Sequence, residues 1–88
     1  MEPSQPQTIF YDTAIVAYLK LKGHIVIPQH KPNDKDKIEF RIDGDPQKIQ
    51  SDLQDYFNNV SVGVQDYVTC IKLTKSLMYA MKDIKGAL

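Results

Sequence analysis

The clearest hydrophobic pattern in the chain is the segment 10–23, in which apolar residues fill every position from 14 to 19. Asp12 or Thr13 can cap a helix at its start, and Gly23 suits the left-handed residue that often ends one. A short helix that is apolar nearly all round must be covered by the rest of the protein or by a partner. We therefore expect this helix at the centre of a small domain.

Two strand patterns follow the glycine. In the segment 24–29, Pro28 lacks an amide donor and so indicates an edge strand or a strand end. In the segment 37–43, apolar and charged residues alternate, which predicts a core face and a solvent face. The expected core face holds Ile38, Phe40 and Ile42, and the expected solvent face holds Lys37, Glu39, Arg41 and Asp43. The polar segment 31–36 joins the two strands into an antiparallel hairpin.

Two further helices complete the chain. Asp45 and Pro46 are typical of a helix start, and the helix should run to about Asn58. Its apolar residues form one narrow stripe: Ile49, Leu53, Tyr56 and Phe57. The last helix should begin after Ser61 or Gly63 and run from Val64 to about Lys85. Its apolar side is nearly half the circumference and holds Tyr67, Cys70, Ile71, Leu73, Leu77, Met78, Met81, Ile84 and Leu88.

These elements predict an α+β fold, a small antiparallel sheet of two or three strands packed by three helices. The order is helix, hairpin, helix, short strand and long helix, with the short third strand expected at 60–62. The segment 8–11 could also add a short edge strand. With 88 residues the chain has room for one domain, residues 8–88, after a flexible tail at 1–7 that contains two prolines.

Composition and charge narrow the class of protein. Hydrophobic residues make up 42% of the chain, and 11 basic residues balance 11 acidic ones, so net charge does not indicate a nucleic-acid or anionic-membrane partner. Cys70 is the one cysteine, which excludes an internal disulfide. No apolar run approaches the ~20 residues that a membrane helix needs. We expect a cytoplasmic protein.

The order of these signals resembles a small family of domains of unknown function from bacteria, archaea and their viruses. The resemblance covers residues 8–82 and rests on packing motifs: Phe10, Asp12-Thr13, Ala14, Ala17, Leu19, Gly23, Ile38-Glu39-Phe40, Tyr56-Phe57-Asn58, Val62 and the segment 67–78. It implies an α+β fold and a prokaryotic or viral origin. It implies no activity, cofactor or site residue.

Catalytic and metal sites are hard to assemble from this sequence. His24 and His30 flank one strand about 20 Å apart, which is too far for one metal ion to bridge, so both are expected to be solvated. Cys70 falls on an apolar helix face, as a packing cysteine does. The acidic residues Asp34 and Asp36 alternate with lysines in a turn. We expect no catalytic residue, no metal ligand and no cofactor, and therefore no enzyme.

The last helix carries the candidate functional residues. Lys72, Lys75 and Lys82 follow one another at helical spacing with Tyr79 among them, which suits either a solvated face, a protein contact or phosphate contact with base stacking. Part of the wide apolar side, namely Leu73, Leu77 and Ile84, packs within the domain or docks on another chain. The sequence favours a non-catalytic accessory or adaptor subunit of a prokaryotic or phage complex, which acts through a protein partner or self-association. The alternative is a small nucleic-acid-binding protein.

Overall fold

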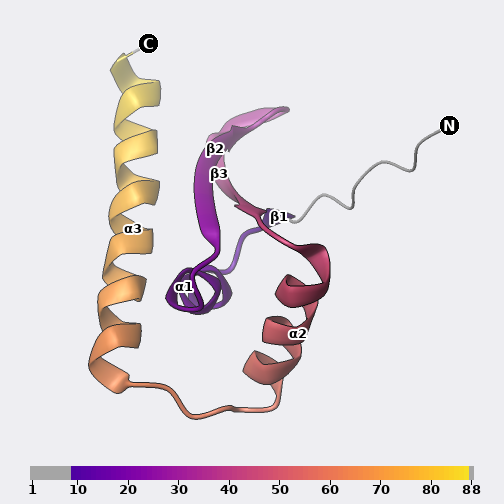
Figure 1. Cartoon of the computed structure of the whole chain (residues 1–88). Helices are drawn as coiled ribbons and strands as arrows, with labels where there is room; N and C mark the ends of the chain where they lie inside the picture. Colours follow the sequence, from indigo (N-terminus) through magenta and orange to yellow (C-terminus); the bar gives the residue numbers. More distant parts are fainter. Residues whose placement is uncertain (1–8, 88) are drawn as a thin grey trace, which may run out of the picture.

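The computed structural model describes residues 9–87, apart from the side chains of Lys35 and residues 84–87. The elements are, in order, β1 (Ile9–Phe10), α1 (Thr13–Leu21), β2 (Ile25–Lys31), β3 (Asp34–Asp43), α2 (Pro46–Phe57) and α3 (Val64–Ala87) (Figure 1). Within this part of the chain the fold is α+β, with three helices and a three-stranded antiparallel sheet, which confirms the predicted class. The tail expected at residues 1–7 lies outside the described residues.

The sheet has the order β1-β3-β2, so β3 is the central strand. Phe40 on β3 lies opposite Phe10 on one side and Pro28 on the other. Pro28 therefore lies on an edge strand, as its missing amide donor predicts. The third strand is the segment 9–10 and not the expected segment 60–62, because residues 60–62 lie in the connection from α2 to α3, far from the sheet edge (Figure 1). The element order consequently begins with a strand.

The ends of the first helix agree with the sequence prediction, whereas the hairpin turn differs in length. The turn is shorter than the expected 31–36, since β2 continues to Lys31 and β3 begins at Asp34. Asp12 caps α1 by accepting hydrogen bonds from the amides of Ala14 (2.8 Å) and Ile15 (3.4 Å). Gly23 follows α1 with φ +94°, a left-handed conformation that favours glycine. Both predicted ends of this helix are confirmed.

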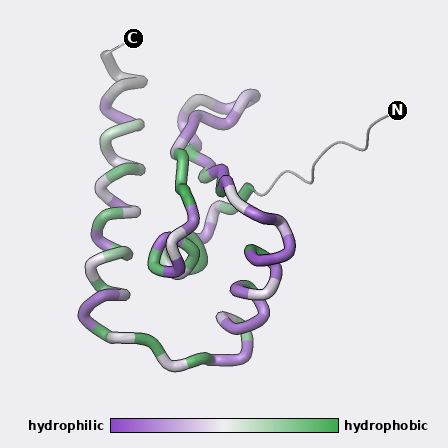
Figure 2. Tube along the Cα trace, viewed as in Figure 1, coloured by the Kyte–Doolittle hydropathy of each residue, from purple (hydrophilic) through white to green (hydrophobic). Residues whose placement is uncertain are grey.

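Helix α1 is covered on every side. Its four consecutive residues Val16–Leu19 are all buried, which one-sided packing of a helix does not produce. The helix contacts α2, α3 and all three strands. Figure 1 shows it between α2 and α3 and against the sheet, and Figure 2 shows hydrophobic residues through its turns. The central position expected from the sequence is confirmed.

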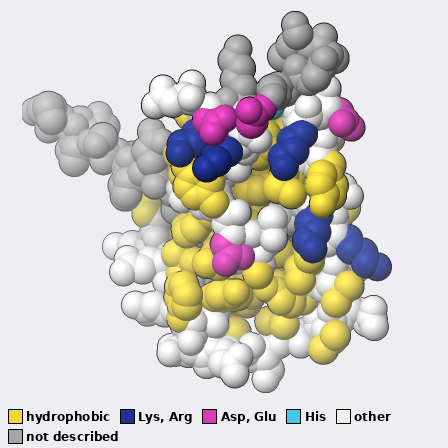
Figure 3. All heavy atoms as spheres, turned by 180° about the vertical axis from the view of Figure 1, so that it is seen from behind, with side chains coloured by type: hydrophobic (Ala, Val, Ile, Leu, Met, Phe, Trp, Pro, Cys, Tyr) yellow, Lys and Arg dark blue, Asp and Glu magenta, His cyan; other side chains and the backbone are white. Residues whose placement is uncertain are grey.

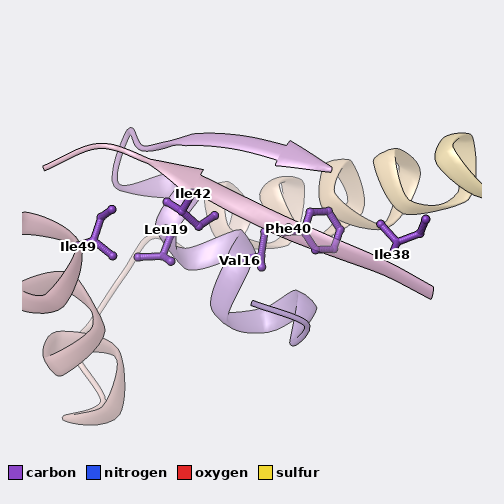
Figure 4. Close-up of a cluster of buried hydrophobic side chains, with 6 residues drawn as sticks. All are labelled: Val16, Leu19, Ile38, Phe40, Ile42 and Ile49. Atoms are coloured by element: carbon purple, nitrogen blue, oxygen red, sulfur yellow. The ribbon is translucent and has the colours of Figure 1, made fainter. Parts of the chain in front are cut away.

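The hydrophobic core joins α1 to β3 and α2. Figure 4 shows the side chains of β3 and α1 meeting, with the α2 residue at one end of the cluster. The buried members are Val16, Leu19, Ile38, Phe40, Ile42 and Ile49. The predicted core face of β3 is therefore confirmed in all three of its residues. From α3, Leu77, Met78 and Met81 pack against this cluster and remain partly exposed.

The last two helices lie on opposite sides of α1. Asp45 caps α2 by accepting from the amide of Gln47 at 3.0 Å, with Pro46 at the first helical position, as predicted. Helix α3 packs across α1, which Figure 1 shows end-on, and it contacts both strands of the hairpin. No helix in the described part of the chain is long and apolar enough to cross a membrane.

Candidate functional site

The four residues of the predicted basic face, Lys72, Lys75, Tyr79 and Lys82, are all exposed on α3. Their spacings of three, four and three residues place them on one side of the helix. We call this set the lysine face. Lys82 also lines a pocket with Lys31 and Lys37 of the hairpin, so the basic surface continues from the helix onto two strands. The sequence could show the first part of this surface and not the second.

The three predicted interface residues have different surroundings. Leu77 packs against the hydrophobic core, whereas Leu73 is 46% exposed, and the side chain of Ile84 lies outside the described residues. Thr74, next to Leu73, is fully buried and donates its hydroxyl to the Cys70 carbonyl at 2.8 Å. The buried stripe of α3 therefore runs beside Leu73 and includes a threonine, which hydrophobicity alone does not reveal.

His24 is a buried residue, and the prediction of a solvated edge histidine is wrong. Its Nε2 lies 2.6 Å from Oδ2 of Asp52, and the two side chains are only 5% and 6% exposed. The hydrogen bond between them offsets the cost of removing both polar groups from water. A Cβ at Gly44 would lie 3.0 Å from Nδ1 of His24, so a side chain at this position would crowd the ring. The available signal was Asp52 itself, a polar residue three positions after Ile49 on the buried stripe of α2.

Glu39 is also buried, although the alternation of β3 predicts that it faces water. It is 3% exposed, and its carboxylate accepts hydrogen bonds from the Gln29 amide at 2.5 Å and the Tyr11 hydroxyl at 3.2 Å. Gln29 lies directly opposite Glu39 in the sheet. Desolvation and the bond to Glu39 raise the pKa of the Tyr11 hydroxyl above its ordinary value. These contacts hold the Tyr11 side chain beside the hairpin.

Three tyrosines meet where α1, α2 and α3 approach one another. Tyr18, Tyr56 and Tyr67 line a pocket of about 190 Å³ together with Asn59, Val60 and Val62. The Tyr67 hydroxyl donates to the Ala14 carbonyl at 2.8 Å, and the rings of Tyr18 and Tyr56 lie 5.5 Å apart. The Tyr18 hydroxyl is buried without a hydrogen-bond partner among the described residues. Burial raises the pKa of Tyr18, and the carboxylates of Asp55 and Asp52 add to the rise.

The other residues considered as catalytic or metal-binding candidates have contacts that are typical of packing and turns. Cys70 is half-buried on α3 and is not in a disulfide. Asp34 accepts a hydrogen bond from the Asp36 amide at 3.0 Å, as an aspartate that stabilises a turn does. His30 is half-buried on β2 with its Nε2 buried, so the prediction that it is solvated is wrong for this histidine too. The described residues contain no group of three or more histidines, cysteines or acids that could hold a metal ion.

Exposed apolar residues gather at the end of the molecule where α2 connects to α3. We call this set the apolar end, and it consists of Phe57, Val60, Val64 and Val68. Phe57 was expected in the buried stripe of α2 but is 70% exposed. It is the last residue of the helix, and its ring lies 5.3 Å from the Tyr56 ring in a T-shaped arrangement. Figure 3 shows hydrophobic side chains over the middle and lower part of one face, with lysine and arginine side chains above and beside them.

Comparisons with protein-family models, with curated proteins and with solved structures found no match to this chain.

Proposed function

We propose that this chain is a non-catalytic interaction module, an accessory or adaptor subunit of a prokaryotic or phage complex that works by protein–protein contact. The observation that carries the proposal is the apolar end. Phe57 and Val64 are each 70% exposed, and Val60 and Val68 lie exposed in the same region. Large apolar side chains exposed in one region, with an aromatic residue among them, are typical of protein interfaces.

The geometry of the His24–Asp52 pair supports a role other than catalysis. A general base must reach the proton that it removes from a substrate. The His24 side chain is 5% exposed, its Nε2 is bonded to Asp52, and its Nδ1 lies against Gly44. In this conformation neither ring nitrogen can meet a substrate. We therefore assign the pair to the attachment of α2.

The proposal predicts that polar substitutions in the apolar end abolish association and leave the fold intact. The variant is Phe57→Ser with Val64→Ser, and the matched control is Ile25→Ser, which changes another exposed apolar residue on the sheet. Light scattering on the purified chain measures self-association, and affinity purification from the native host followed by cross-linking identifies the residues in contact. We expect cross-links at the apolar end in wild type and in the control, and their loss in the double variant.

Retention of the same complex by a folded Phe57→Ser/Val64→Ser variant would contradict this proposal. A wild-type chain that stays monomeric and forms cross-links only at other surfaces would contradict it equally. Leu73→Ser tests the other possible contact surface. Loss of the complex in that variant would assign the contact to the side of α3 expected from the sequence.

A second function, nucleic-acid binding, is favoured by the lysine face. Three lysines lie exposed on one side of α3, and Tyr79 among them is 57% exposed. Ammonium groups at this spacing suit a phosphate backbone, and an exposed ring can stack on a base. The protein surface thus offers both kinds of contact that single-stranded nucleic acids use.

This second function predicts a steep salt dependence. Each phosphate contact on a single strand contributes about −0.7 to the slope of log affinity against log salt, so three lysines predict about −2. The measurement is fluorescence anisotropy with a labelled single strand at several salt concentrations. Lys72→Glu with Lys75→Glu should flatten the slope, whereas Lys22→Glu with Lys48→Glu makes the same change in net charge elsewhere and should not. Absence of binding at low salt would exclude this function.

A further inference from the structure

A pocket of about 430 Å³ lies where the hairpin meets the second half of α3. Its walls come from segments far apart in the chain: the residue after β1, both strands of the hairpin and α3. A volume of this size is within the range of small-molecule sites in proteins, which begins at about 300 Å³. It is also larger than the tyrosine-lined pocket between the helices, which measures about 190 Å³.

The charged lining of this pocket is predominantly basic. Lys31, Lys37 and Lys82 contribute three ammonium groups, and Asp36 contributes one carboxylate. The chain as a whole has no net charge, so the excess of cations here is local. Several ammonium groups around one concave site attract an anion, and lysines in particular bind phosphate as point charges. The lining therefore favours a ligand with a phosphate group.

The rest of the lining is apolar or aromatic. Ile38 and Met78 line the pocket together with Tyr11. The hydroxyl of Tyr11 donates to the buried carboxylate of Glu39, and the ammonium of Lys31 lies 5.7 Å from the centre of its ring. The ring is thus held by one contact at its hydroxyl and by another over its face. An aromatic ring and a methionine side chain are suitable neighbours for a flat heterocycle.

We propose that this pocket binds a nucleoside phosphate, with the phosphate at the three lysines and the base at the wall of Tyr11, Ile38 and Met78. The ligand is either a free mononucleotide or one nucleotide unit of a single strand, which present the same two chemical groups. This proposal does not depend on the protein-interaction role. The pocket shares Lys82 with the lysine face. It also requires Lys31 and Lys37 of the hairpin, which binding to the lysine face alone would not require.

The test is isothermal titration calorimetry on the full chain with AMP, adenosine, inorganic phosphate and a short single-stranded oligonucleotide. We expect AMP to bind more tightly than either adenosine or phosphate, because each of those lacks one of the two groups. Lys31→Ala and Lys37→Ala should each weaken AMP binding about tenfold, the effect of losing one hydrogen bond to a charged group. Tyr11→Ala should bring the affinity for AMP close to that for phosphate.

The control is Lys48→Ala, which removes an exposed lysine of α2 and should leave AMP binding within about twofold of wild type. If an oligonucleotide binds much more tightly than AMP, the ligand is a nucleotide unit of a single strand. If the two bind with equal affinity, the ligand is the free nucleotide. The proposal is overturned if neither AMP nor the oligonucleotide binds at low salt. It is also overturned if Lys48→Ala weakens binding as much as Lys31→Ala, or if phosphate alone binds as tightly as AMP. Circular dichroism of each variant establishes that it is folded.

Discussion

Replacing Asp52 with alanine is expected to lower the free energy of unfolding by about 3 kcal/mol, because the buried His24 ring then loses its hydrogen-bond partner. Both side chains are almost fully buried, and their atoms lie 2.6 Å apart. The bond joins α2 to the residue that precedes β2, and α2 otherwise contacts mainly α1. Loss of the bond should therefore loosen α2 together with its buried Ile49. The free energy of unfolding of a native protein is only about 5–15 kcal/mol, so a loss of about 3 kcal/mol is a large fraction of the total.

The measurement is chemical denaturation followed by circular dichroism, with three comparison variants. Gln50→Ala changes an exposed residue of the same helix and should cost less than about 0.5 kcal/mol. Asp52→Asn keeps a polar side chain of the same size and should cost less than Asp52→Ala. The double variant His24→Leu with Asp52→Leu replaces both partners by apolar groups and should recover most of the loss. Equal stability of Asp52→Ala and Gln50→Ala would contradict the assigned role.

The sequence predicted those parts of the fold that depend on local chemistry. Asp12 and Asp45 are helix caps because their carboxylates reach amides two residues ahead, and that reach depends only on the chain nearby. Gly23 marks the end of α1 because a left-handed residue is needed directly after the helix. The alternation in β3 identified Phe40 and its neighbours as the core face, since the period of a strand is fixed.

The errors in side-chain burial concern residues whose surroundings come from elsewhere in the chain. The polar residues His24 and Glu39 are buried because Asp52, Gln29 and Tyr11 supply hydrogen-bond partners, two of them 28 positions away. Periodicity assigns polar residues to the solvent and cannot show such partners. Phe57 shows the reverse case, because it has the right spacing for the buried stripe but is 70% exposed at the last residue of α2.

The candidate sites divide in the same way. The lysine face could be predicted because helical spacing alone places its residues together. The pocket at the hairpin could not, because Tyr11, Lys31 and Lys82 come from three separate segments of the chain that only the packing of α3 against the sheet brings together. The apolar end likewise requires the path of the chain between α2 and α3, which contains no regular element.

Tyr18→Phe is expected to raise the free energy of unfolding by about 1 kcal/mol, whereas Tyr67→Phe should lower it by about the same amount. Both changes remove one hydroxyl and keep the ring. The Tyr18 hydroxyl is buried without a partner among the described residues, so its removal ends a cost of desolvation. The Tyr67 hydroxyl donates to the Ala14 carbonyl, and its removal leaves that carbonyl without this bond. Opposite signs in thermal or chemical denaturation would confirm the assignment, and a loss of stability in both variants would refute it.

The same residue should affect stability at alkaline pH. Burial raises the pKa of Tyr18 in the folded protein, so the folded state keeps its proton when the unfolded chain, with an ordinary value near 10, begins to lose it. The unfolded state then binds fewer protons than the folded state, and stability falls as the pH rises through 10 toward the higher folded value. The pKa of Tyr67 is raised by burial and that of Tyr11 by desolvation and its bond to Glu39, so wild type should lose stability at all three residues. The free energy of unfolding of Tyr18→Phe should fall less steeply than that of wild type between about pH 9 and pH 11, the range that surrounds the ordinary pKa of tyrosine. An identical fall in the two proteins would show that the Tyr18 hydroxyl is solvated.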